Sequence, residues 1–213
     1  MDSATAAQLG VDPGRMRQEV ETERMGQGVN FSTVRAGLHF GLGAAWVDHG
    51  KDLLDSDRSR GEDLLRRGVK QIEEAAKQVP YPPYMRRLAE AYSALGLTDQ
   101  AEKAYRGALR IAPDDFALHY DLAGLYYVAK QYSKALVEMR AARKPGKSLT
   151  APELSDYHFG MGLVQLDGFQ KQGEALYHFQ EAIKAYPQHR EAKRMRELIQ
   201  EISGRRVKPA PED

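Results

Sequence analysis

Histidine is the side chain with the most evident chemistry in this 213-residue chain, which contains six histidines and no cysteine. Two of them begin nearly identical pentapeptides, HFGLG at residues 39–43 and HFGMG at residues 158–162, and His119 begins a related stretch. Neutral imidazole is a common zinc ligand. However, equivalent side chains on neighbouring packed helices lie about 10 Å apart, too far to share one ion through bonds of about 2 Å. We therefore expect His39, His119 and His158 to be packing residues, and we expect no metal site.

No residue pattern typical of an enzyme accompanies these histidines. The sequence has no phosphate-binding G-x-x-x-x-G-K-[ST] loop, no G-x-S-x-G nucleophile turn and no H-E-x-x-H metal motif. Because cysteine is absent, there is no thiol nucleophile and no disulfide, and the redox compartment is left undetermined. We expect a protein that is not an enzyme and needs no cofactor.

A basic cluster lies near the C-terminus and consists of Arg190, Lys193, Arg194 and Arg196. Such a cluster could dock an acidic partner or a phosphate backbone. However, Glu191 and Glu197 interrupt it, and no aromatic residues alternate with it. The formal net charge of the whole chain is only +1. We therefore interpret the cluster as a solvated helix face, and nucleic acid is not an expected partner.

The most apolar run of the chain is GLHFGLGAAWV at residues 37–47. It has about half of the roughly 20 residues that a membrane-spanning helix needs, so we expect no membrane span. The first residues also lack a basic stretch followed by an apolar one, which argues against a secretory signal. These features predict a cytoplasmic location, with a periplasmic one as the alternative if a leader has been removed.

The elements that must position these residues follow from an internal repeat. A pattern of Ala, then an aromatic residue or Met four positions later, then Ala three positions later occurs at residues 101–108, 135–142 and 175–182. Residues 68–75 hold a weaker copy. In the weaker copy and in the first and third full copies, a proline follows five residues after the last Ala, at Pro80, Pro113 and Pro187. Proline stops a helix because it lacks the amide donor and clashes with the preceding turn, so each copy predicts one helix.

Each of these helices has a second helix before it. Apolar residues recur at helical spacing in residues 84–95, and residues 119–128 repeat the arrangement. A short break follows each, with Thr98 and Ser133 as expected N-caps. The sequence SRGE at residues 59–62 predicts a further helix start. Short connections place the two helices of a pair antiparallel.

This arrangement resembles the tetratricopeptide repeat, in which a first helix carries W-x2-L-G-x2-Y, a second carries A-x3-F, and a proline closes the unit. The resemblance covers about residues 36–188. It departs from the pattern at Met85 and His119 in the Trp position, and at Ala89 and Ala123 in the Gly position. The resemblance implies an all-α protein, a right-handed α-solenoid of about four antiparallel helix pairs with a C-terminal capping helix.

The two related pentapeptides are then the same part of the first helix of a repeat. His39 and His158 stand in the Trp position, and Leu42-Gly43 and Met161-Gly162 stand in the Leu-Gly position, where small residues let two helices approach closely. In this register the fourth repeat requires one extra residue in its turn. A register shifted by one, with Phe159 in the Trp position and Leu163 in the Gly position, needs no insertion, and the sequence leaves both open.

The repeat assignment predicts the organisation of the chain. A mobile segment at residues 1–30 and a disordered tail at residues 205–213 are expected because both are polar. An atypical, elongated first helical hairpin covers residues 31–81. Three repeats follow at residues 82–115, 116–149 and 155–188, and a capping helix occupies residues 189–204.

In the resembling family, the residues that follow the Trp, Gly and Tyr positions line a concave groove. The resemblance therefore implies a partner-binding set of ten residues: Phe40, Arg86, Glu90, Ser93, Tyr120, Gly124, Tyr127, Phe159, Leu163 and Leu166, with Ala44 and Val47 beside them. Tyr120 and Tyr127 flank Gly124, which predicts a peptide slot with polar tips. Glu90 and Asp121 lie where a carboxylate clamp would need donors, so an acidic chain terminus is not the expected ligand.

These observations predict a protein–protein interaction module, an adaptor or assembly factor that holds a peptide or helix of a partner in an apolar, Tyr-containing groove. Two alternatives stay open at the level of the sequence. One is a self-assembling scaffold, a homo-oligomer that uses its N-terminal segment. The other is a chaperone of the secretion or pilus type that protects an aggregation-prone subunit.

Overall fold

The computed structural model describes residues 31–144, 146 and 148–206, with the side chains of residues 205 and 206 left aside. All regular structure in this part of the chain is helical, with nine α-helices and one short π-helix. The mobile segment expected at residues 1–30 lies outside the described residues, as does most of the tail expected at residues 205–213. The chain forms two compact units, and the division falls between Ile111 and Ala112.

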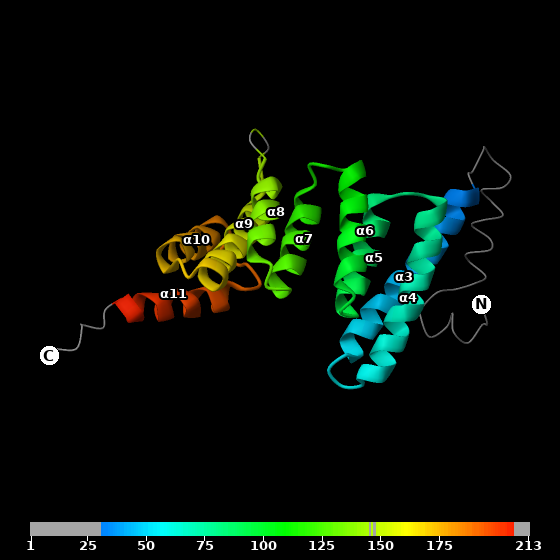
Figure 1. The fold of residues 1–213 in the computed structure, drawn as a ribbon, viewed down its shortest axis with the longest axis horizontal. Coiled ribbons are helices and arrows are strands. Elements are labelled where there is room, and N and C mark those ends of the chain that lie inside the picture. Colours follow the sequence, from blue (N-terminus) through cyan, green and yellow to red (C-terminus); the bar gives the residue numbers. More distant parts are fainter. Residues whose placement is uncertain (1–30, 145, 147, 207–213) are drawn as a thin grey trace. The chain divides into compact units, whose positions relative to one another are not determined.

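The described part of unit 1, residues 31–111, consists of two helix pairs. Helix α3 (Phe31–Leu53) packs along α4 (Arg58–Gln78), α5 (Pro82–Ala94) packs along α6 (Thr98–Ile111), and α4 also contacts α5. Figure 1 shows that the two helices of each pair run in opposite directions. Their core is a cluster of buried apolar side chains: Val47, Leu65, Val69, Ile72 and Ala91.

Glycines bring α3 and α4 into backbone contact at two levels. Gly43 lies opposite Gly68, and Gly50 lies opposite Gly61. A Cβ atom added to any of these four residues would lie 2.8–2.9 Å from the carbonyl oxygen of the opposite glycine, closer than real Cβ atoms come. Gly43, which the repeat pattern places in the Gly position, is therefore required by a close approach of two backbones.

Unit 2 contains two further helix pairs and a final helix. Helix α7 (Phe116–Val128) pairs with α8 (Tyr132–Ala142), and α9 (Ala151–Leu163) pairs with α10 (Gln172–Ala185). Helix α11 (Ala192–Arg206) packs against α10. The described helices thus form the class that the sequence predicts, an α-solenoid of antiparallel helix pairs followed by a single helix.

The register of the fourth repeat is settled by a π-helix, η1 (Val164–Gly168), which continues α9. Gly162 faces the ring of Phe179, where an added Cβ atom would lie 2.5 Å from the ring, so Gly162 and not Leu163 occupies the Gly position. The positive-φ turn residues Gly96 and Lys130 come seven residues after the Gly position of their repeats, whereas Gln170 comes eight after Gly162. The extra residue therefore lies inside the wide turn of η1 and not in the connection that was expected to hold it.

Two predicted helix starts are wrong in detail. Asp57, not a residue of SRGE, caps α4 by accepting a hydrogen bond from the Arg60 amide at 3.1 Å. Ser133 lies inside α8, which begins at Tyr132 without a side-chain cap. Sequence spacing sets a helix start only to within one or two residues, because neighbouring polar side chains compete for the same free amides.

Candidate functional site

Three of the six predicted groove residues of unit 2 lie on one face of α7. We call the four residues Tyr120, Gly124, Tyr127 and Val128 the α7 stripe, since steps of three and four keep them on one side of a helix. Gly124 is exposed, and a Cβ atom added there would meet nothing within 4 Å. Val128 is 79% exposed, the most exposed large apolar side chain of the described residues. Sequence reasoning missed Val128, although its spacing of four from Gly124 was a usable signal.

The two tyrosines of the α7 stripe are held in place by their neighbours. Tyr120 is half-buried and stacks on Phe116, with ring centroids 5.7 Å apart. The Tyr127 hydroxyl donates a hydrogen bond to Asp167 of η1. Burial raises the pKa of both phenols, and the Asp167 carboxylate adds to the increase in the pKa of Tyr127. Both side chains therefore remain neutral and ordered beside the open space at Gly124.

The groove residues predicted on the fourth repeat are covered. Phe159 is only 6% exposed and packs between Phe179 and His189, at centroid distances of 6.2 and 5.8 Å. Leu163 and Leu166 are partly buried against the same cluster, which includes Met195 of α11. The structure therefore places Phe159 in the core and not on an open surface, because α11 packs over this part of α9 and η1.

The basic cluster near the C-terminus also has a more specific environment than a solvated helix face. The guanidinium group of Arg194 lies 5.8 Å from the ring centroid of Phe159. The side chain of Arg190 interacts with the Tyr120 hydroxyl and lowers its pKa slightly against the larger effect of burial. Both arginines are nevertheless exposed. Helix α11 and the turn before it thus bring two positive charges to the aromatic residues of α7 and α9.

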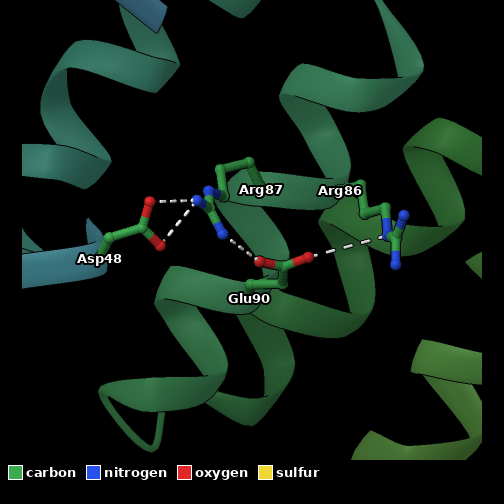
Figure 2. A network of polar contacts seen from close by, with 4 residues as sticks. All are labelled: Asp48, Arg86, Arg87 and Glu90. Atoms are coloured by element: carbon green, nitrogen blue, oxygen red, sulfur yellow. Dashed lines mark hydrogen bonds and ion pairs between the residues drawn. The ribbon is translucent and has the colours of Figure 1, made fainter. Parts of the chain in front are cut away.

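The predicted groove residues of unit 1 form a polar surface. Figure 2 shows Arg87 of α5 between Asp48 of α3 and Glu90, with nitrogen–oxygen distances of 2.6 and 2.8 Å, and Arg86 on the other side of Glu90 at 3.7 Å. The Glu90 carboxylate is therefore flanked by two guanidinium groups. Arg87 and Asp48 were missed from the sequence, although the Arg87–Glu90 spacing of three is typical of a helical ion pair.

The remaining predicted residues of unit 1 differ in exposure. Phe40 is partly buried and stacks on Tyr84 of α5, with ring centroids 4.5 Å apart. Val47 is fully buried in the core and therefore cannot line a surface. Ser93 is exposed on α5. Of the residues expected in unit 1, the structure thus leaves Arg86, Glu90 and Ser93 as a polar face and turns the apolar ones inward.

The three histidines in the Trp position each bond the second helix of their own pair. His39 bonds Gln71 at 2.7 Å, His119 bonds Glu138 at 2.8 Å, and His158 bonds His178 at 2.9 Å. Each partner directly precedes the residue in the aromatic position of the second helix. Within the described residues, no group of three or more potential ligands could hold a metal ion.

In unit 2, the pKa values of the two histidines in the Trp position are shifted in opposite directions. The Glu138 carboxylate raises the pKa of His119. Burial, together with the facing imidazole of His178, lowers the pKa of His158 to about 4. Burial lowers the pKa of His178 as well. The same position of the repeat therefore favours a charged imidazole in one pair and a neutral one in the next.

Comparison with known proteins agrees with this architecture. The family model for the tetratricopeptide repeat matches residues 94–147. No curated protein matches the sequence. Residues 94–147 thus match a tetratricopeptide repeat, and the described helix pairs have the fold of solved tetratricopeptide-repeat structures.

Three solved structures illustrate the likeness of fold. The thermophilic TPR protein TTC0263 of Thermus thermophilus is 16% identical, with a TM-score of 0.55, over 77% of this chain and 98% of that one. MamA (41-end) of Desulfovibrio magneticus RS-1 is 16% identical, with a TM-score of 0.51, over 80% and 99%. The APC/C hetero-tetramer Cut9-Hcn1 is 12% identical, with a TM-score of 0.52, over 89% of this chain but 41% of that one. In the described part of the chain, no helix has the length and hydropathy needed to cross a membrane.

Proposed function

We propose that this protein is a non-catalytic protein–protein interaction module, an adaptor or assembly factor, and that the α7 stripe binds a peptide or helix of a partner. The observation that carries this proposal is the open space at Gly124, flanked by Tyr120 and Tyr127 and adjoined by the exposed Val128. A ligand backbone can approach α7 most closely where no side chain projects.

The neighbouring residues suit such a ligand physically. Tyr127 is already fixed by Asp167, and Tyr120 by Phe116, so little side-chain entropy is lost on binding. Aromatic side chains of this kind bury a large apolar area and keep a polar tip for a hydrogen bond. Asp167 and Arg194 place opposite charges beside Tyr127, which favours one orientation of a bound chain.

The surface of unit 1 is the weaker choice for the main contact. Arg86, Arg87, Glu90 and Asp48 form ion pairs among themselves, so a ligand would have to compete with existing partners. We therefore assign the affinity for a ligand to the α7 stripe.

The test fills the open space at Gly124. Peptides are first selected on the immobilised wild-type chain from a displayed library of random peptides. Binding of the selected peptides is then measured for Gly124→Trp and Gly124→Ala. Gly124→Trp should weaken binding at least about tenfold, because the indole occupies the slot. Gly124→Ala adds one methyl group and should retain binding.

Tyr127→Phe provides a second, milder variant, because it removes the hydroxyl but keeps the ring. We expect a small loss of affinity together with unchanged helical content. Peptides that bind wild type and Gly124→Trp equally well would contradict the assignment of the α7 stripe, and selection of no peptide at all would contradict the proposed function.

A further inference from the structure

Helix α3 has a face with exposed apolar residues, and with Arg35 among them, that no other described helix covers. Phe31 and Leu38 on this face are 57% and 41% exposed. Gly41 lies beside them, and a Cβ atom added there would meet nothing within 4 Å. We call Phe31, Leu38, Gly41 and Leu42 the outer face of α3. The opposite side of the helix carries Gly43, Val47 and Gly50, which pack against α4.

The equivalent face of α9 indicates the role of the outer face of α3. In α9, the residues equivalent to Leu38, Gly41 and Leu42 are Tyr157, Gly160 and Met161, which keep the same spacing from the histidine in the Trp position. Tyr157 and Met161 are 7% and 6% exposed and belong to one core cluster with Phe116 of α7 and with Met139 and Ala142 of α8. An added Cβ atom at Gly160 would lie 2.8 Å from Met139. In α9 this face is covered by the preceding helix pair.

Helix α5 shows the same relation within unit 1. Its equivalent residues are Tyr84 and Leu88, and both pack against the core that α3 and α4 form with Val47 and Ile72. The first helix of a pair thus uses this face to contact whatever precedes it in the chain. Helix α3 has the same kind of face, and the chain that precedes it is residues 1–30.

The preceding segment can reach the whole face. Helix α3 has 23 residues and is therefore about 35 Å long. Thirty residues that end at Phe31 can return along that length even after a turn, for which Gly26 and Gly28 are suited. The segment also carries Met16 and Val20, four residues apart, between Pro13 and Gly26. This is the spacing of apolar residues on one side of a helix.

Tethering favours this segment over a second copy of the chain. A segment joined directly to the end of α3 has an effective concentration of about millimolar at the face, well above ordinary protein concentrations. We propose that residues 1–30 dock on the outer face of α3 and take the place that a preceding helix pair occupies at α9. The proposal is independent of the function assigned to the α7 stripe, and it replaces the free segment that polar composition predicts.

The absence of native cysteine makes the test direct, because a single introduced thiol can be labelled alone. Gly41→Cys places a thiol on the outer face of α3, and Gly124→Cys places one on the α7 stripe, both at glycines where an added Cβ atom meets nothing within 4 Å. Each variant is made in the full chain. The rate of maleimide labelling is then measured, with circular dichroism as the check that the helices are formed.

Each cysteine variant is combined with a pair of substitutions in the N-terminal segment. Met16→Asp with Val20→Asp replaces two apolar residues of the segment by charged ones, whereas Gln18→Asp with Thr22→Asp introduces the same charges at two polar residues. We expect the first pair to raise labelling at position 41 about tenfold, the change that release of a mostly docked segment gives. The control pair should leave it unchanged, and labelling at position 124 should not respond.

Three results would overturn the proposal. Equal labelling at position 41 with and without the charge pairs would mean that the segment does not cover α3. Labelling at position 41 that slows as the protein concentration rises about a hundredfold would assign the outer face to a second copy. A response at position 124 in place of position 41 would assign the segment to the α7 stripe.

Discussion

The same pentapeptide pattern stands in two very different surroundings in this protein. HFGLG lies in α3 and HFGMG in α9, and both place a histidine and a final glycine toward the second helix of the pair. In α3 the final glycine faces a backbone, that of Gly68, whereas in α9 it faces the ring of Phe179. The middle glycine, Gly41, meets nothing within 4 Å in α3, whereas its counterpart Gly160 is in tight contact with Met139.

The sequence pattern of a repeat and the residues that surround it determine different properties. The pattern decides the direction of each side chain, because helical spacing fixes it relative to the partner helix. The neighbouring residues determine how much a substitution changes the free energy of unfolding. A methyl group added toward a backbone, a ring, a flexible side chain or open space changes it by four different amounts. The two copies therefore predict unequal effects for equal substitutions.

The largest expected effect is that of Gly43→Ala. The added Cβ atom would lie 2.9 Å from the Gly68 carbonyl oxygen and 2.7 Å from Ile72, and a backbone carbonyl within a helix cannot turn away. We expect a loss of about 3 kcal/mol in the free energy of unfolding, near the upper end of the cost of overpacking. The chain has one tryptophan, Trp46 in α3, so urea unfolding followed by its fluorescence reports on unit 1.

The matched substitution in the second copy is Gly162→Ala, which faces the buried ring of Phe179. It should also destabilise, but its effect should be seen in the unfolding of unit 2 by circular dichroism, with the Trp46 transition unchanged. If Gly43→Ala left the Trp46 transition in place, the close approach of α3 and α4 would be wrong.

The second expected effect is a pH-dependent loss of stability at the pair of His158 and His178. The folded pKa of His158 is about 4, below its unfolded value of about 6.5, so the unfolded state takes up the proton first. Stability is therefore fully present above about pH 6.5 and is lost as the pH falls toward about 4, by about 3 kcal/mol. Urea unfolding of unit 2 at several pH values between these limits measures the loss.

Replacement of His178 by Gln gives the second copy the polar pair of the first, in which His39 bonds Gln71. Burial remains but the facing imidazole is gone, so the acid-dependent loss should fall to about half. His158→Gln removes one of the two titrating groups and leaves His178, whose pKa burial also lowers, so it should reduce the loss without abolishing it. Equal acid sensitivity in wild type and both variants would show that the pair does not control it.

The smallest expected effects come from replacing the middle glycine of each pentapeptide by Ala. The two changes in the free energy of unfolding should have opposite signs. Gly160→Ala pushes against the flexible end of Met139 and should cost about 1 kcal/mol. Gly41→Ala meets no neighbour and replaces a helical glycine, so it should stabilise by about 0.5–1 kcal/mol. Thermal unfolding of the two variants beside wild type distinguishes them, because the two midpoint temperatures should move in opposite directions.

The sequence was sufficient for features that depend on spacing alone. The apolar periodicity and the closing residues Pro80, Pro113 and Pro187 predicted helix ends, and α4, α6 and α10 end two residues before them. The pairing of Gly43 and Gly162 with the second helix also followed from the pattern. Both depend on rules that act within a helix or within one helix pair.

The sequence was insufficient where a third element decides burial. Phe40, Tyr120 and Phe159 hold the same position in their repeats, yet Tyr84, Phe116 and α11 cover them to different degrees. The role of Arg87 depends on Asp48, which lies 39 residues earlier. Sequence spacing predicts the face of a helix on which a residue lies, but it does not predict which other residues cover that face.

The wide turn of η1 has a consequence for how sequences of this kind are aligned. One inserted residue in a regular helix rotates everything after it by about 100° relative to what came before. Here the π-helix at residues 164–168 contains the inserted residue. His158 and Gly162 before it and Gln170 after it therefore keep the positions that their equivalents have in the other repeats. An alignment that puts the gap in the connection after the helix misassigns Asp167, the acceptor of the Tyr127 hydroxyl, by one residue. Gaps in such repeats therefore belong inside the helix.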